Sequence, residues 1–275
     1  MNLHARESEH GADHEPLAAK TAPTAAPRSP AAVADVLLLQ RQIGNRSVGR
    51  VLGGFRTLAR NTTTVSNPLS EARSGGLAPI SWTSSYDVDF TSTECLVTVR
   101  VRLVRDGDVT EEQQRTVETE AQNALRRVWD RRFELEDLDT HQRFTIGVHV
   151  QFVREHEHVT VALHSGARAQ DLANWSVQKP PTSRAHELGH QLGMYDEYVD
   201  AQVINRATAT SPGVYVDHSV MGNYYREGAD EAVAQLRHGV RLADAIGRAT
   251  RRRFRVSLTP GPGDYVAPAG DTRVV

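Results

Sequence analysis

The sequence predicts an α+β domain, because segments with strand periodicity and segments with helix periodicity follow one another between residues 94 and 258. Residues 95–104 and 143–153 alternate apolar and polar side chains, as half-buried strands do. Residues 110–132 and 229–252 instead repeat apolar side chains at helical spacing. A shorter helix is expected over residues 183–192, after two prolines that block a helix before them.

The first strand and the first helix have the clearest patterns. In the strand, one face carries the apolar side chains Val97, Val99, Val101 and Leu103. In the helix, the apolar face carries Val117, Ala121, Leu125 and Val128. This helix begins with acidic residues and ends with basic ones, an arrangement that complements the helix dipole.

A second alternating run, residues 159–163, follows the strand at 143–153 after the polar turn at 154–157. Two alternating runs joined by a short polar turn predict an antiparallel hairpin. Three histidines lie close by, His156, His158 and His164, and they raise the question of a metal site. Solvated histidines at a turn and a strand end are the interpretation that we favour.

Composition limits the classes of partner. The chain has 275 residues and a formal net charge of −2, so nucleic acid is not an expected partner. No stretch reaches the roughly 18 apolar residues that a membrane span requires. Cys95 is the single cysteine, which excludes an internal disulfide and fits folding in a reducing cytosol. The N-terminus is polar and acidic, unlike a classical signal peptide, so we expect synthesis in the cytoplasm.

The segments outside residues 94–258 are not expected to form domains. Residues 1–32, rich in Ala, Pro and Thr, predict a disordered tail. Residues 33–56 predict a short helical docking segment, and residues 57–93, rich in Ser, Thr, Asn and Gly, predict a linker that becomes ordered near the domain. Residues 259–275 contain Pro-Gly-Pro-Gly and predict a flexible tail.

The run from residue 186 to residue 198 reads HELGHQLGMYDEY and carries the clearest chemical signal. His186 and His190 are four residues apart, so on a helix they share one face and can hold one metal ion. Glu187 lies beside them and suits a general base that acts on water at the metal. Gly193 can end the helix and turn the chain, which would bring Asp196 to the metal as a third ligand.

These residues match the extended zinc signature of the metzincin metallopeptidases, in the variant with aspartate as the third ligand. The run Ser219-Val220-Met221-Gly222 resembles the methionine turn of the same family. The resemblance covers roughly residues 94–255. It implies a twisted sheet, mostly antiparallel or mixed, that is backed by a helix, with the active-site helix below it and a mainly helical C-terminal part.

The resemblance also implies a zinc-dependent endopeptidase that acts on proteins or peptides. His186, His190 and Asp196 would hold the zinc ion, Glu187 would be the catalytic base, and Met221 would support the site from below. Three further residues are candidates for orienting the metal ligands or for stabilising the transition state. Glu197 would orient a histidine, and Tyr224 and Tyr225 are candidates because Asn223 occupies the position where some metzincins place a tyrosine.

Residues 39–48 resemble a string near the N-terminus of many actinobacterial proteins, several of them associated with extracellular contractile injection systems. This resemblance implies that residues 33–56 dock the protein in such a particle, as a toxin or effector cargo that is delivered outside the cell. The competing interpretation is a helix that packs on its own catalytic domain.

Two other functions stay open. A non-catalytic structural or adaptor component of the particle could keep a protease-like fold, although an intact Glu187 argues against it. A housekeeping cytoplasmic peptidase that acts on short peptides also agrees with the sequence.

Overall fold

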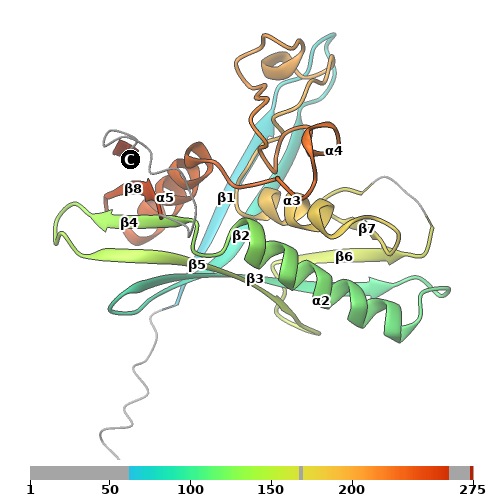
Figure 1. The fold of residues 1–275 in the computed structure, drawn as a ribbon, viewed down its shortest axis with the longest axis horizontal. Coiled ribbons are helices and arrows are strands. Elements are labelled where there is room, and N and C mark those ends of the chain that lie inside the picture. Colours follow the sequence, from blue (N-terminus) through green and yellow to red (C-terminus); the bar gives the residue numbers. More distant parts are fainter. Residues whose placement is uncertain (1–61, 167–169, 260–272, 275) are drawn as a thin grey trace, which may run out of the picture. The chain divides into compact units, whose positions relative to one another are not determined.

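A computed structural model describes residues 62–166, 170–259 and 273–274 (Figure 1). The chain divides into two compact units, Met1–Leu58 and Ala59–Val275, and only the second contains described residues. The tail predicted at 1–32, the docking segment predicted at 33–56 and residues 260–272 of the C-terminal tail lie outside the described residues. Residues 273–274 form a short strand.

A mixed sheet dominates the second unit and confirms the α+β class. It has nine strands, and seven of them follow one path. That path is β1 (Thr63–Glu71), β2 (Ile80–Phe90), β3 (Glu94–Arg105), β5 (Arg143–Phe152), β4 (Phe133–Asp137), β8 (Phe254–Leu258) and β9 (Arg273–Val274). The other two, β6 (Val159–His164) and β7 (Asn174–Ser176), extend the sheet beside β3. Pairing is parallel for β3–β5, β3–β6 and β6–β7, and antiparallel for the other pairs.

Three longer helices pack on this sheet. They are α2 (Glu111–Val128), α3 (Pro181–Gln191) and α5 (Leu236–Thr250). Helices α2 and α3 lie against each other, and α2 also contacts β5 (Figure 1). Helix α5 contacts β1 and β8, which are far apart in the strand order, so the sheet curls around this helix. None of the described helices has the length and apolar character of a membrane span.

The prediction of a linker at 57–93 is wrong over most of its length, because β1 and β2 belong to the sheet. Serine and threonine also occur in strands, so the Ser- and Thr-rich composition of residues 57–93 does not exclude a strand. Some apolar residues of this segment occupy buried positions. Val65, Tyr86 and Val88 are fully or almost fully buried in the core. The folded domain therefore includes residues 63–90 and does not begin at residue 94.

The predicted hairpin is also wrong. Strands β5 and β6 both run parallel to β3, with β5 beside residues 94–101 on one edge and β6 beside residues 101–105 on the other. Val101 is the partner of Phe152 at the end of β5 and of Val159 at the start of β6. The intervening loop crosses from one edge of β3 to the other without reversing the chain, and His158 N–H donates to Arg100 O at 2.8 Å where the chain rejoins the sheet.

The expectation of a mainly helical C-terminal part is not supported. Between α3 and α5 the chain forms only the 3₁₀ turn η1 (Ile204–Arg206) and the single-turn helix α4 (Tyr224–Glu227). Helix α5 begins later than the predicted residue 229, because Val233 exchanges backbone hydrogen bonds with Val220 and His218. That pairing holds residues near 233 in extended form beside the turn that contains Met221.

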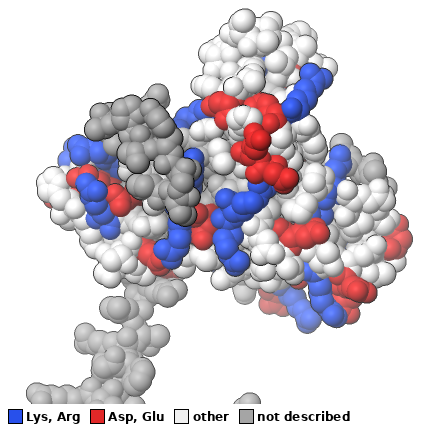
Figure 2. All heavy atoms as spheres, viewed as in Figure 1, with Lys and Arg blue, Asp and Glu red and all other residues white. Residues whose placement is uncertain are grey.

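Charged side chains are mixed on the face shown in Figure 2, where arginines and carboxylates alternate. Many charged side chains of the described residues pair with the opposite charge, as Arg143 does with Glu134 and Arg255 with Glu136. This face therefore offers no broad basic surface of the kind that binds nucleic acid.

Candidate metal centre

Helix α3 presents the two histidines from a fixed position between α2 and the sheet. Pro181 is the first residue of α3, a position where the backbone N–H has no hydrogen-bond partner within the helix, so proline loses no bond there. Further along the helix, Trp129 Nε1 donates to Ala185 O at 2.9 Å. At its C-terminal end, Trp82 Nε1 donates to His190 O at 3.1 Å and Ser84 Oγ donates to Gln191 O at 2.7 Å. Strand β2 thus satisfies carbonyl groups that the helix end leaves free.

The chain reverses immediately after α3 and returns to the histidines. Gly193 has φ of 94°, a conformation that glycine adopts without strain. Asp196 Oδ1 then lies 3.1 Å from His186 Nε2 and 3.4 Å from His190 Nε2. Ligand atoms of His186, Glu187 and His190 lie within 4.8 Å of one another, so these residues could hold a metal ion. The structure brings all four predicted residues together.

Hydrogen bonds to backbone carbonyls fix which nitrogen of each histidine is free. His186 Nδ1 lies 2.9 Å from Val220 O, and His190 Nδ1 lies 2.9 Å from Met194 O. A carbonyl oxygen only accepts, so each Nδ1 carries the proton. In a neutral imidazole, Nε2 then keeps its lone pair, and this is the form that binds a metal.

The two carboxylate oxygens of Asp196 have different surroundings. Oδ2 accepts from the Tyr198 hydroxyl at 3.1 Å and from Arg206 Nη2 at 3.2 Å. Oδ1 is buried and has no hydrogen bond of acceptable geometry, although its distances to both histidines fall within ion-pair range. Two imidazole nitrogens and one unsatisfied carboxylate oxygen form a donor set that suits a borderline cation such as zinc.

The protonation of the two histidines and Asp196 indicates which charge a bound cation would replace. Burial opposes the charged form of His190, but the adjacent carboxylate of Asp196 outweighs it and raises the pKa of His190 to about 9. Burial alone would raise the pKa of Asp196, but His186 and His190 hold it well below its usual range. A proton on a histidine therefore balances the Asp196 charge in the absence of a metal. A bound cation would replace that proton.

Glu187 is buried beside the donor set and belongs to no described ion pair or side-chain hydrogen bond. Burial raises the pKa of its carboxyl, and the nearby charges of His186 and His190 oppose this effect. A carboxyl group whose pKa is moved towards neutrality can both accept and return a proton near pH 7.

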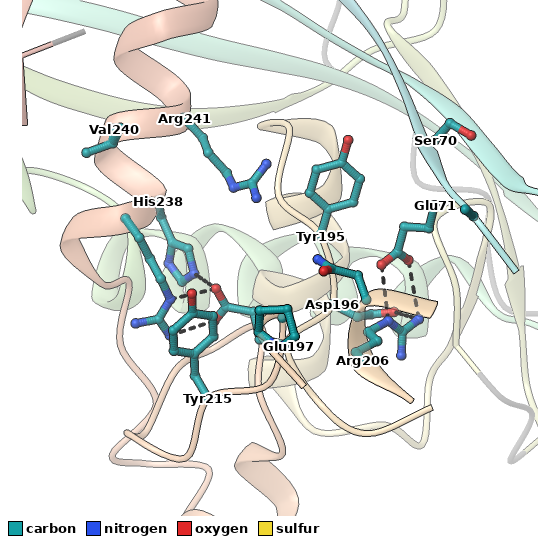
Figure 3. A pocket seen from close by; sticks show the side chains of 15 residues that line it. Ser70, Glu71, Tyr195, Asp196, Glu197, Arg206, Tyr215, His238, Val240 and Arg241 are labelled. Atoms are coloured by element: carbon teal, nitrogen blue, oxygen red, sulfur yellow. Dashed lines mark hydrogen bonds and ion pairs between the residues drawn. The ribbon is translucent and has the colours of Figure 1, made fainter. Parts of the chain in front are cut away.

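Arg206 is a residue that the sequence analysis did not identify. Its guanidinium is buried, and it donates to both oxygens of Glu71, at 3.1 and 3.3 Å, and to Asp196 Oδ2 (Figure 3). The turn that carries it is attached to the β1–β2 hairpin, since Ile204 N–H donates to Ala72 O at 3.0 Å. Arg206 thus connects the hairpin to the third ligand. Its position in an irregular segment gave no periodic signal that could have revealed it.

Met221 packs against α3 at Gly189, in the last turn of the helix. It is completely buried, and a Cβ atom added to Gly189 would lie 2.5 Å from Met221 Sδ and 2.9 Å from Trp129 Cζ2. Gly189 stands directly before His190, so the absence of a side chain there lets the methionine approach the helix between the two histidines. The neighbouring Val220 carbonyl holds His186, as described above.

Glu197 supports the turn around Met221 rather than a ligand histidine. Its carboxylate accepts from Arg237 at 2.6 and 2.7 Å and from Ser219 Oγ, and its N–H donates to Met221 O at 2.8 Å. His238 Nε2 lies 3.2 Å from the same carboxylate. Burial would raise the pKa of Glu197, but these partners lower it to about 2. No described contact of this carboxylate involves His186 or His190.

Tyr224 and Tyr225 both line a hollow that also contains His186 and Glu187. The ring of Tyr224 is buried, with its centroid 5.6 Å from that of His186, whereas Tyr225 is 57% exposed. Burial raises the pKa of Tyr224, so its hydroxyl remains protonated. Tyr224 is therefore the nearer of the two to the candidate ligands.

The other histidines do not form a second centre in the described part of the chain. His158 Nδ1 accepts from Arg100 N–H at 3.0 Å and its Nε2 contacts Asp87, while His164 contacts Asp106 and Asn174. The expectation that these histidines are solvated is wrong for His158 and His164, whose side chains are largely buried. Within the described ranges, His186, Glu187 and His190 form the one such group of potential metal ligands.

Comparison with protein-family models, with curated proteins and with solved structures found no match.

Proposed function

We propose that the protein is a zinc-dependent endopeptidase of the metzincin type. The observation that carries this proposal is the convergence of His186 Nε2 and His190 Nε2 on Asp196 Oδ1, at 3.1 and 3.4 Å, beside the buried Glu187. The Gly193 turn and the placement of Met221 under Gly189 support the family assignment.

In this proposal the zinc ion, when bound, lowers the pKa of a water molecule towards 7 and polarises the scissile carbonyl. Glu187 accepts the proton of the attacking water on its carboxylate and later delivers it to the leaving amine. Arg206 and Tyr198 donate to Asp196 Oδ2 and so hold the carboxylate with Oδ1 beside the two histidines. Tyr224, whose hydroxyl stays protonated, lines the hollow beside His186 and Glu187.

Room for substrate on both sides of Glu187 favours an endopeptidase. One hollow of about 280 Å³ lies between α3 and β2, and it is lined by Trp82 and Ile80. A second of about 270 Å³ lies towards Tyr224 and Tyr225. Both are lined by His186 and Glu187, so a peptide that crosses the site could place side chains on either side of the scissile bond.

The test compares zinc-loaded wild type with Glu187→Ala on a diverse peptide mixture, at equal zinc content. We expect internal cleavage by the wild type and a loss of roughly 100- to 10,000-fold in the variant, which is the usual contribution of a general base. Equal cleavage by the two proteins would overturn the proposed mechanism. Zinc binding without cleavage in either protein would favour the non-catalytic component with a protease-like fold.

Delivery as a toxin or effector cargo of a contractile injection particle is a separate proposal that rests on residues 33–56 of the sequence. In this proposal the protein is made in the cytoplasm and leaves the cell inside the particle. Deletion of residues 1–56 should abolish association with the particle and leave peptidase activity intact. Particle loading that survives the deletion would refute the docking role.

A further inference from the structure

The two hollows that flank Glu187 differ in their chemistry. The lysine hollow, towards α4, is lined by Lys179, Gln170, Asn223 and the two tyrosines. The tryptophan hollow, towards β2, is lined by Trp82, Ile80, Leu172 and the carboxylates of Glu71 and Asp171. A substrate that lies across the site would therefore meet different groups on the two sides of the bond to be cleaved.

Lys179 supplies the positive charge of the lysine hollow. The chain contains only two lysines, Lys20 and Lys179, among 32 basic residues. Lys179 lies directly before Pro180 and its N–H donates to Ser176 O at 3.3 Å, so the backbone at its base is fixed. Its Nζ lies 5.9 Å from the ring centroid of Tyr225, and no described carboxylate pairs with it. This half-buried ammonium group is thus available to a ligand.

Gln170 adds neutral donors at the same place. Its side-chain nitrogen and oxygen are both buried and have no hydrogen-bond partner. Gln170 lines both hollows beside Glu187. A buried amide group without partners is costly, and a bound substrate that hydrogen-bonds to it removes that cost.

The tryptophan hollow disfavours an acidic substrate side chain, which the lysine hollow attracts. Ile80 and Leu172 give it apolar walls, and Asp171 places negative charge at its border. Glu71 is already neutralised by Arg206, whereas Asp171 is exposed and bonds only to its own loop. An acidic substrate side chain would be repelled there, so a preference for acidic residues should apply to one side of the scissile bond.

We propose that the protein selects peptides with an aspartate or glutamate side chain next to the scissile bond, held by Lys179, and an apolar side chain across the bond in the tryptophan hollow. This inference rests on the proposed peptidase function and names its substrate class. A charge-assisted hydrogen bond in a partly buried site corresponds to roughly tenfold in specificity. Reversal of the Lys179 charge should therefore reverse the preference.

The first experiment profiles the cut sites of zinc-loaded wild type, Lys179→Met, Lys179→Glu and Arg154→Glu in one peptide library. Arg154 is exposed in the loop between β5 and β6 and lines neither hollow, so Arg154→Glu controls for net charge. We expect acidic residues to be enriched about tenfold at one position beside the wild-type cut sites, unchanged in Arg154→Glu and lost in Lys179→Met. Lys179→Glu should prefer lysine or arginine at that position.

The second experiment separates this inference from the proposed catalysis. Two fluorescent peptides, which differ only by glutamate or glutamine at the selected position, are titrated into zinc-loaded Glu187→Ala. The same titration is repeated with the double variant that carries Glu187→Ala and Lys179→Glu. Tighter binding of the glutamate peptide by about tenfold, and its reversal in the double variant, would support the Lys179 subsite even without cleavage. Equal binding of the two peptides, or cleavage without any acidic preference, would refute the subsite and leave the peptidase proposal standing.

Discussion

The charge of Glu197 should stabilise the fold, and its replacement by glutamine tests this directly. Glu197→Gln keeps the shape of the side chain and removes its charge, which leaves Arg237 paired only with Asp217. The partners of Glu197 lower its pKa from 4.5 to about 2. At about 1.4 kcal/mol per pKa unit, this corresponds to about 3 kcal/mol of folding free energy at neutral pH.

The sign of the effect follows from the lowered pKa. The folded protein holds the Glu197 carboxylate ionised to lower pH than the unfolded chain does, so the contribution is complete well above pH 4.5 and is lost as the pH falls to about 2. The difference in free energy of unfolding between wild type and Glu197→Gln should be about 3 kcal/mol at pH 7 and about 1.4 kcal/mol at pH 3.

Urea denaturation with chelator present measures this difference without a contribution from bound metal. Glu112→Gln, which removes an exposed carboxylate of α2, is the matched control and should behave as the wild type at both pH values. If the gap between wild type and Glu197→Gln is the same at pH 7 and pH 3, the charge of Glu197 does not stabilise the turn around Met221.

Two further substitutions test the supports of the candidate centre. Gly189→Ala places a Cβ atom 2.5 Å from Met221 Sδ. We therefore expect the free energy of unfolding to fall by about 1–3 kcal/mol and zinc to bind more weakly. Gly107→Ala is the control, because its Cβ atom meets open space, and it should change neither property. Arg206→Lys keeps the charge but loses the planar guanidinium group that holds Asp196. Zinc affinity, measured by competition with a chelator, should therefore fall about tenfold. An unchanged affinity would exclude an orienting role for Arg206.

The sequence predicted the elements whose signals are local. Helix α2 and strand β3 lie within a few residues of the predicted bounds, because their apolar periodicity is long and regular. The spacing within HELGH similarly required only a helix for His186 and His190 to share a face. These features depend on neighbours three or four positions away, which a single sequence displays.

Features that depend on distant pairing were missed. The loop between β5 and β6 reads as a hairpin turn, and only the parallel pairing of both strands with β3 shows that the chain does not reverse. Arg206 contacts Glu71, which lies 135 residues earlier, and nothing near either residue indicates this contact. Glu197 was expected beside a histidine ligand because it follows Asp196, but the backbone turn directs it towards Arg237 instead.

The support of the candidate centre extends over much of the domain. Strand β2 holds the end of α3, the β1–β2 hairpin holds Arg206, and the turn at Met221 is fixed by α5 through Arg237. Rigid support of this kind keeps ligand atoms in place before a metal arrives, which lowers the ordering cost of binding. It also explains why the strands at 63–90, which the sequence analysis read as a linker, matter for the site.

The most direct test of the account is the position of zinc in a crystal of the full-length protein grown with one equivalent of the ion, located by anomalous scattering. We predict one strong peak per chain within about 2.0–2.2 Å of His186 Nε2, His190 Nε2 and Asp196 Oδ1. A peak at other side chains, or none at these three atoms, would contradict the proposed centre and the chemistry built upon it.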